Sequence, residues 1–170
     1  CKTRCTYCDF YMGTNESHID AFVEALCVEA VLRRDEAKEP IGTIYFGGGT
    51  PSRLQEHHFE RIFDTLYRHY PIVPDAEITV EANPDDLTED YVTMLAALPF
   101  NRLSIGIQSF DDGELQFLCR RHNAQEAIDA VRRCQQHGFN NISIDLIYGL
   151  PGQSLTVWQR NLEQALALDI

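Results

Sequence analysis

Three cysteines, Cys1, Cys5 and Cys8, stand within the first eight residues of the chain. Thiols this close in sequence are too constrained for an ordinary disulfide pair, and in a reducing compartment such groups bind metal more often than they pair. A structural zinc site takes four protein ligands, and the sequence offers no fourth cysteine or histidine nearby. A four-iron cluster held by three thiolates instead leaves one iron free for an outside ligand. The spacing therefore favours an iron–sulfur cluster, with zinc and purely structural thiols as alternatives.

Polar and glycine-rich residues also follow four predicted strands, at the point where each strand ends. They are Gly47-Gly48-Gly49-Thr50-Pro51, Glu81-Ala82-Asn83-Pro84, Gln108-Ser109-Phe110, and Asp145 with 149–152 (Gly-Leu-Pro-Gly). Ligands of parallel α/β folds bind at the carboxyl ends of the strands. One such end would mean little, but four together predict a rim built for a ligand.

The elements that must position these residues alternate between strand and helix. Hydrophobic periodicity predicts strands at 43–46, 77–81, 102–107 and 141–148. It predicts helices at 17–37, 55–70, 88–98, 123–138 and 155–168, with helical turns from Asp112. Short connections between alternating elements are typical of parallel strands with helices packed outside. The predicted class is α/β, either an open doubly wound sheet or a barrel.

Composition limits the partners. The 170 residues are 44% hydrophobic and 24% charged, which suits one domain with a sizeable core. The net charge of −12, from 26 acidic and 14 basic residues, argues against a nucleic-acid partner. No apolar run approaches the ~20 residues of a membrane span. We therefore expect a cytoplasmic protein without a transmembrane segment.

The two ends of the chain suggest an internal fragment of a longer protein. The sequence opens on Cys1 and stops at Ile170, where the alternation predicts a further strand. We expect residues 1–170 to be one core domain whose flanking strands lie outside this range.

The first eight residues, CKTRCTYC, are similar to the cluster motif of the radical S-adenosylmethionine superfamily. Four later segments, 47–51, 81–84, 102–110 and 144–152, resemble the oxygen-independent coproporphyrinogen III oxidase family in the same order. The resemblance covers essentially the whole chain. It implies a partial (β/α)6 TIM-like barrel of the radical SAM type, incomplete at both ends. It also implies a [4Fe-4S] cluster and S-adenosylmethionine as cofactors.

Residue by residue, the resemblance implies that Cys1, Cys5 and Cys8 ligate the cluster, with Tyr7 packed beside it near the adenine. The backbone of 47–49 would approach the methionyl amine, which residues without a Cβ allow. The other cofactor-binding positions that it implies are Thr50, Glu81, Gln108, Arg120 and Asp145. Arg120 suits a carboxylate, either of the methionyl group or of a porphyrin propionate.

Each of these positions has a structural alternative. The glycines could form only a tight turn, Glu81 and Asp145 could cap helices, and Gln108 could satisfy buried backbone groups. Arg120, next to Arg121, could be a solvated surface charge.

The remaining cysteines and the histidines carry no predicted chemistry. We interpret Cys27, Cys119 and Cys134 as small buried or half-buried thiols. Four histidines are placed at helix edges without a metal signature: His57, His58, His69 and His137.

Two departures separate the chain from the dehydrogenases of the resembled family. Phe10 stands where they carry a further cysteine, and Ser109 stands where they tend to have aspartate. Both departures favour the haem-chaperone branch, whose implied partners are haem, a haem-acceptor protein and an electron donor. A coproporphyrinogen III dehydrogenase acting on a porphyrinogen is the alternative, and a zinc-binding scaffold is a distant third.

Overall fold

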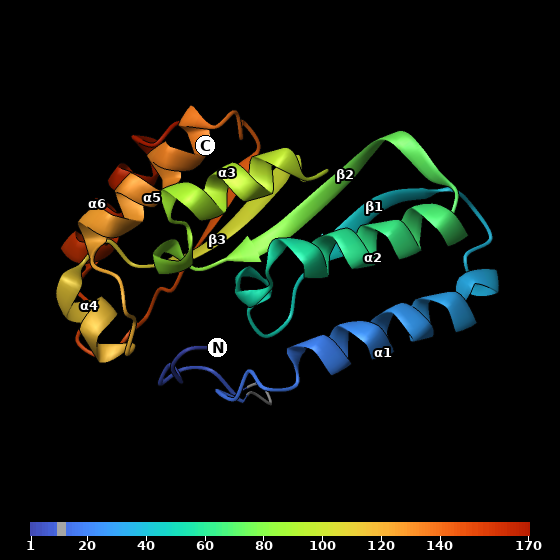
Figure 1. The fold of residues 1–170 in the computed structure, drawn as a ribbon. Coiled ribbons are helices and arrows are strands. Elements are labelled where there is room, and N and C mark those ends of the chain that lie inside the picture. The colour runs from blue at the N-terminus through green and yellow to red at the C-terminus, as the bar shows by residue number, and fades with distance from the viewer. Residues whose placement is uncertain (10–12) are drawn as a thin grey trace.

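The computed structural model describes residues 1–9 and 13–170 (Figure 1). Within this part of the chain, one parallel sheet runs in the order β1-β2-β3-β4. The strands are β1 (Ile41–Phe46), β2 (Ile72–Ala82), β3 (Arg102–Gln108) and β4 (Ile142–Leu146). Sequence order and spatial order coincide. Because all four strands are parallel, their carboxyl ends lie along one edge of the sheet. The predicted α/β fold of parallel strands is confirmed.

Helices connect the strands and cover one face of the sheet (Figure 1). They are α1 (Ile19–Leu32), α2 (Glu56–His69), α3 (Glu89–Ala97), α4 (Asp112–Phe117), α5 (Ala124–Gln136) and α6 (Leu155–Leu166). Three single 3-10 turns lie between them, at Arg34–Glu36, Pro51–Arg53 and Pro84–Asp86. None of the described helices is long and apolar enough to cross a membrane.

Two predicted boundaries were wrong. The first helix ends at Leu32 rather than near residue 37, because the chain tightens there into a 3-10 turn. The second strand begins at Ile72 rather than at Glu77. Pro74 and Asp75 disfavour strand structure, and the pairing with β1 accommodates them through a register shift.

The core lies between the sheet and the helices. Successive strand residues point to opposite faces, so every second residue of a strand faces the helices. The residues at these helix-facing positions are apolar. They are fully or nearly fully buried, with Val80, Leu103 and Ile105 each at 0% exposure. Phe59 and Phe100 pack edge to face there, with ring centroids 5.1 Å apart.

The opposite face of the same strands is polar. It carries Tyr45, Thr79, Glu81, Ser104 and Asp145 at alternating positions. Arg102 crosses this face and donates to Thr79 Oγ1 at 3.3 Å and to Ser143 Oγ at 3.0 Å, which joins β2 to β4. The polar face ends at the strand edge that holds the candidate site.

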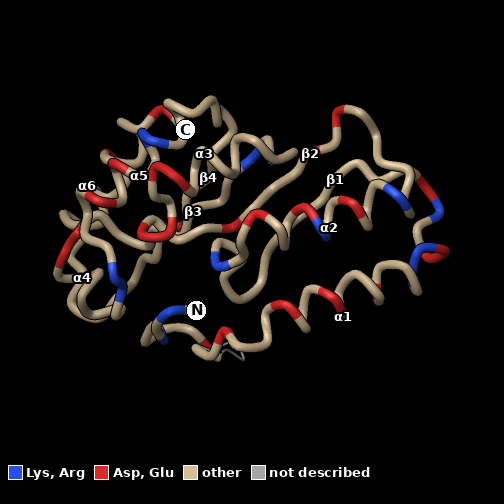
Figure 2. The backbone as a smooth tube through the Cα atoms, viewed as in Figure 1, with Lys and Arg blue, Asp and Glu red and all other residues tan. Residues whose placement is uncertain are grey.

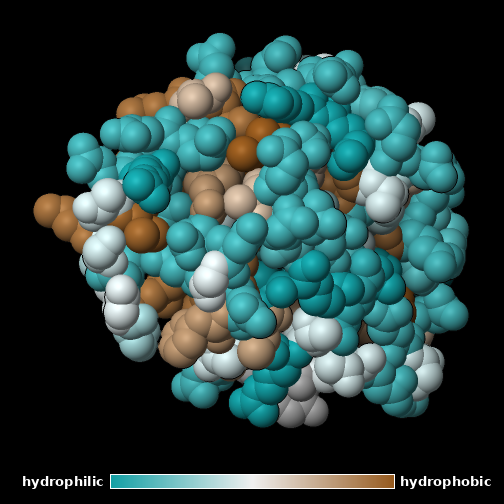
Figure 3. Space-filling model, turned by 90° about the vertical axis from the view of Figure 1, so that its left-hand side faces the viewer, coloured by the Kyte–Doolittle hydropathy of each residue, from teal (hydrophilic) through white to brown (hydrophobic). Residues whose placement is uncertain are grey.

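Helix α1 packs loosely against the rest. Val23 and Cys27 are its buried residues, and they pack with Ile62 of α2. A largely apolar cavity of about 610 Å³ separates α1 from β1 and α2. On the side formed by α4 and α6, the surface is mostly hydrophilic, with apolar side chains in separate patches (Figure 3). The exposed apolar residues of α4 and α6 include Phe117, Leu155 and Leu166.

Candidate functional site

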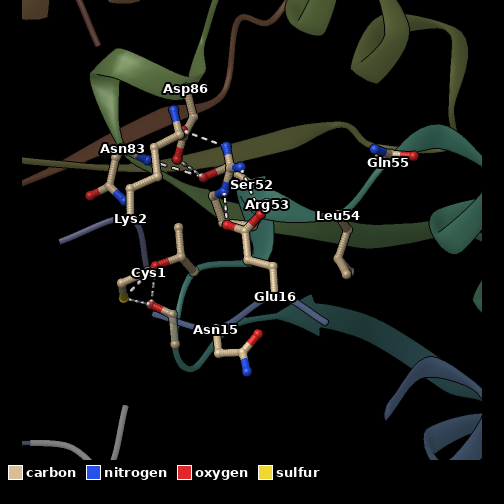
Figure 4. Close-up of polar contacts among 12 residues, drawn as sticks. Cys1, Lys2, Asn15, Glu16, Ser52, Arg53, Leu54, Gln55, Asn83 and Asp86 are labelled. Atoms are coloured by element: carbon tan, nitrogen blue, oxygen red, sulfur yellow. Dashed lines mark hydrogen bonds and ion pairs between the residues drawn. The ribbon is translucent and has the colours of Figure 1, made fainter. Parts of the chain in front are cut away.

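The three predicted cluster ligands meet at the carboxyl edge of the sheet. Cys1, Cys5 and Cys8 line one cavity of about 180 Å³. The same cavity is lined by the glycine loop after β1, by Asn83 after β2 and by Arg120 after α4. Cys1 Sγ lies 2.7 Å from Thr50 Oγ1 and donates to the Gly49 carbonyl at 3.5 Å (Figure 4). Segments far apart in the sequence therefore converge on the thiols.

The spacing of the thiols bears on the choice of metal. Among the described residues, Asp20, His57 and His58 form the one group of three acidic, histidine or cysteine donors whose ligand atoms all lie within 4.8 Å of one another. The three cysteine sulfurs are therefore spread more widely than that. A tetrahedral zinc ion with Zn–S bonds of about 2.3 Å would bring its sulfurs to roughly 3.8 Å. At least one pair of the cysteine sulfurs is therefore farther apart than a single tetrahedral zinc ion would hold it.

The cysteine loop is bound to the C-terminal end of α4 by hydrogen bonds to backbone carbonyls. Thr6, which lies between two of the cysteines, donates its N–H to the Leu118 carbonyl at 3.3 Å and its Oγ1 to the Phe117 carbonyl at 3.1 Å. The Cys8 N–H donates to the Cys5 carbonyl at 3.3 Å and closes a turn. These contacts hold the thiols on the wall of the cavity.

Arg120 lies inside the site, so its interpretation as a solvated charge was wrong. Its Nη2 donates to Asn83 Oδ1 at 2.7 Å and to the Gly106 carbonyl. Its Nη1 lies 3.7 Å from Cys5 Sγ and 3.4 Å from the Tyr7 hydroxyl. Burial raises the pKa of the Tyr7 phenol, with Arg120 opposing the shift.

The glycines after β1 differ in what surrounds them. A Cβ on Gly47 would lie 2.6 Å from the Tyr45 ring, so Gly47 makes room for a side chain of this chain itself. Gly48, at φ +105°, and Gly49 have open space where a Cβ would project. Approach by an outside ligand is therefore open at Gly48 and Gly49, whereas Tyr45 already occupies the space beside Gly47.

Glu81 is held by two donors at the end of β2. Tyr45 OH donates to its Oε1 at 2.8 Å, and the Gly48 N–H donates to its Oε2 at 3.2 Å. These contacts fix the carboxylate and exclude the role of helix cap. Burial raises the pKa of the Tyr45 phenol, and its hydrogen bond to Glu81 acts in the same direction. Sequence reasoning missed Tyr45, although its position two residues before Gly47 places both on one face of β1.

A second, smaller cavity of about 130 Å³ adjoins the first. Glu81, Gly106 and Asp145 line it together with Gly49 and Thr50, which brings together residues at the carboxyl ends of all four strands. Asp145 therefore faces the site.

Gln108 is not among the residues that line this cavity. The residue is buried and has a left-handed backbone at φ 76°. Its Nε2 would be 2.8 Å from a Cβ on Gly106. Gln108 packs over the end of its own strand.

Of the two branch-distinguishing residues, Ser109 can be placed in the structure, and it lies away from the cavity. Ser109 is fully buried, and its Oγ bonds to Glu114 and to Asn161 of α6. It joins α6 to the turn after β3 and does not reach the cavity lining. Phe10 lies outside the described residues.

The prediction for Cys119 was wrong, whereas Cys27 and Cys134 are buried as expected. Cys119 is exposed and lines the same cavity as Cys1, Cys5 and Cys8. Its backbone is left-handed, with φ 56°. A fourth thiol therefore stands near the site, although it is more than 100 residues from the others in sequence.

The histidine prediction needs one correction. His58 is buried rather than at a helix edge, and it belongs to the group with Asp20 and His57. Its Nδ1 accepts from the Gln55 N–H at 3.0 Å, so in the neutral ring Nε2 carries the proton that is donated to Asp20 Oδ1 at 2.7 Å. With both ring nitrogens engaged, His58 has no lone pair for a metal. The group joins α1 to α2.

The fold and the site together define a parallel α/β protein with a thiol-rich cavity at the carboxyl ends of its strands. Residues 1–164 match the model of the radical SAM superfamily, and the chain belongs to that superfamily.

The relatives of the chain include heme chaperones and a coproporphyrinogen III oxidase. It is 38% identical to the heme chaperone HemW of Lactococcus lactis and 37% identical to that of Bacillus subtilis, over 100% and 99% of its own length. It covers 44% and 45% of those proteins, so it spans less than half their length. The structure of coproporphyrinogen III oxidase (HemN) from Escherichia coli superposes with a TM-score of 0.89 at 30% identity, over 99% of this chain and 39% of that one.

Proposed function

We propose that the chain binds a [4Fe-4S] cluster through Cys1, Cys5 and Cys8, and S-adenosylmethionine beside it, in the core of a haem chaperone. The observation that carries the proposal is the single cavity in which the three thiols meet Arg120 and the open backbone of Gly48 and Gly49. When bound, cluster and cofactor supply radical chemistry.

The residues of the chain suit this cofactor by charge and shape. Glu81, fixed by Tyr45 and the Gly48 N–H, presents a carboxylate suited to an ammonium group such as that of the methionyl moiety. Arg120 donates to neutral oxygens, and its buried Nε has no partner among the described residues. It is the cation in this cavity best placed for a carboxylate. Asp145 lines the adjoining space, where ribose hydroxyls would find an acceptor.

Haem carriage is supported by the names of the relatives. Two of them are heme chaperones, each matched over nearly the whole chain. Transfer to a haem-acceptor protein, reduction by an electron donor and a cytoplasmic location are further parts of this proposal.

Oxidative decarboxylation of coproporphyrinogen III is the second candidate. The close superposition on the coproporphyrinogen III oxidase of Escherichia coli favours it. Because Ser109 is buried away from the cavity, its difference from the dehydrogenase pattern does not by itself remove this activity.

The test is anaerobic reconstitution of the full chain, followed by reductant, S-adenosylmethionine and coproporphyrinogen III, with haem binding measured in parallel. We expect iron loading, cofactor binding and stable haem binding without change to the tetrapyrrole. Formation of 5′-deoxyadenosine in proportion to decarboxylated product over many turnovers would establish the dehydrogenase instead.

Cys119 supplies a matched control for the metal. Under a three-thiolate cluster, Cys5→Ser abolishes iron loading, whereas Cys119→Gly leaves it unchanged. Zinc without iron, lost in both variants, would indicate a four-thiolate zinc site and refute the proposal.

A further inference from the structure

One buried carboxylate outside the cofactor cavity gathers cations from the loops that form it. Asp86 lies in the 3-10 turn after β2, and its side chain is 1% exposed. Its Oδ1 pairs with Lys2 Nζ and with Arg53 Nη1 at 3.4 Å, and its Oδ2 accepts from Ser52 Oγ at 2.8 Å (Figure 4). Arg121 Nη2 lies 3.7 Å from the same carboxylate.

The three cations come from three different parts of the site. Lys2 follows Cys1 directly, Arg53 follows the glycine loop, and Arg121 follows Arg120. Figure 2 shows Lys and Arg positions near the N-terminus and beyond α4, in a chain whose net charge is −12. Lys2 and Arg121 also pair with the neighbouring Asp85, and Arg121 lies nearer to it than to Asp86. In so acidic a protein, three cations gathered at these two adjacent carboxylates require an explanation, and Asp86 is the buried one.

Arg53 extends the contact to the far end of the cysteine segment. Its Nε and Nη2 donate to the two carboxylate oxygens of Glu16 at 2.7 and 3.1 Å. This pairing lowers the pKa of Glu16, which keeps it charged. The segment that carries all three thiols is therefore attached to one anchor twice, through Lys2 between Cys1 and Cys5 and, by way of Arg53, through Glu16 after Cys8.

The energetics favour a role in positioning. A buried carboxylate is costly unless cations and hydrogen bonds compensate it, and here both do. Lys2 and Arg53 are only 30% and 28% exposed, so their pairs with Asp86 are less screened than surface pairs. Geometry fixed before the ligand arrives reduces the ordering cost of binding.

We infer that Asp86, with Lys2, Arg53 and Glu16, forms a clamp that sets the position of the cysteine loop before the cluster is bound. We name this set of residues the Asp86 clamp. Asp86 touches neither thiol nor cofactor, so it is a positioning residue. The inference rests on the proposed cluster for its function, but the clamp itself is a property of the metal-free protein.

The test compares Asp86→Asn and Lys2→Met with Glu89→Gln in the full chain. Glu89 is a 67% exposed carboxylate on α3 that pairs with Arg133, so its variant removes one charge outside the clamp. The first readout is hydrogen exchange at the Thr6 and Cys8 amides of the metal-free protein. The second is the rate at which ferrozine removes iron from the reconstituted protein.

We expect both clamp variants to exchange faster at Thr6 and Cys8 and to release iron about tenfold faster, because each loses a hydrogen bond to a charged group. Glu89→Gln should match the wild type. In the Asp86→Asn background, Lys2→Met should add less than it does alone, since only the pair of Lys2 with Asp85 remains to be lost.

The outcomes separate the clamp from the proposed function. If both clamp variants exchange hydrogen and release iron at the same rates as the wild-type protein, the inference of a clamp is wrong. If the wild-type protein binds no iron, the proposed function fails, and the exchange data alone decide whether the clamp exists. Lys2→Met changes a partly exposed side chain, so it remains informative if Asp86→Asn does not fold.

Discussion

The two faces of the sheet differ although the same strands build both. On the helix side, Val80 and Leu103 pack into an apolar core at 0% exposure. On the other side, Thr79, Glu81 and Ser104 form a polar face joined by hydrogen bonds. Parallel sheets usually bury apolar residues on both faces. The polar face therefore reflects what the site requires, while the apolar face supplies the stability.

Arg120 and His122, two residues apart after α4, show the same contrast between a polar and an apolar environment. Arg120 donates to the Gly106 carbonyl and faces the cofactor cavity. His122 is buried, and its Nε2 lies 3.1 Å from the Ile107 carbonyl. One residue brings a permanent charge to the polar face, and the other is held neutral beside the core.

The largest expected effect comes from replacing two neighbouring residues on β3 that face opposite sides of the sheet. Leu103→Ala on the helix side should cost about 2–5 kcal/mol of unfolding free energy, because the transfer term and a cavity add. Ser104→Ala on the polar face should cost less than about 1 kcal/mol. Urea denaturation of both variants measures the difference. Equal losses would show that the polar face also carries the fold.

His122 tests the same contrast through pH. Burial lowers the pKa of His122 to about 4, with the charge of Arg120 acting in the same direction. Its buried Nδ1 has no hydrogen-bond partner among residues 1–9 and 13–170, so a proton there would be uncompensated. The unfolded state, with a pKa near 6.5, binds the proton more readily. Neutral His122 therefore contributes about 3 kcal/mol to the unfolding free energy above about pH 6.5. This contribution is lost as the pH falls from 6.5 toward 4.

Replacement of His122 isolates this contribution. In His122→Gln the fall in unfolding free energy between pH 7.5 and pH 5 should be smaller than in the wild type, as measured by urea denaturation at both pH values. An identical fall in the two proteins would assign the acid sensitivity to other groups.

On the polar face, Tyr45→Phe should affect binding more than stability. It removes the hydrogen bond to Glu81 but keeps the ring beside Gly47. We expect S-adenosylmethionine affinity to fall by about three- to tenfold, equivalent to about 0.5–1.5 kcal/mol. Titration of the reconstituted protein measures it, and Tyr67→Phe on α2, also exposed, is the matched control. An unchanged affinity in Tyr45→Phe would mean that the hydrogen bond from the Tyr45 hydroxyl to Glu81 does not contribute to binding of S-adenosylmethionine.

Local patterns predicted much of this molecule. Short-range periodicity shows the alternation of strands and helices, so the parallel sheet and the convergence of strand ends followed from the sequence. The strand order did not, because a doubly wound sheet and a barrel were both left open. The cysteine spacing and the glycine run are also local. Their meeting in one cavity followed from the rule that parallel strands end at one edge.

The contacts that hold the site were not predictable in this way. The ion pair between Lys2 and Asp86 joins residues more than 80 positions apart in sequence, and the hydrogen bond between Ser109 and Asn161 joins residues 52 positions apart. The surroundings of a glycine are equally non-local: Gly47 was expected to admit a ligand, but Tyr45 fills that space. Which side chain occupies a gap depends on packing that one-dimensional spacing does not contain.

Cys119 gives the smallest and most specific prediction, because its environment is set by the backbone. At φ 56° a residue with a Cβ pays roughly 1–2 kcal/mol, whereas glycine adopts this conformation freely but loses about 0.5–1 kcal/mol in unfolded-state entropy. Cys119→Gly should therefore stabilise the protein by about 0.5 kcal/mol in urea denaturation. Cys119→Ala removes the thiol but keeps the Cβ, and it should have no effect. If alanine stabilises as much as glycine, the thiol on the cavity wall, and not the backbone, is the source of the strain.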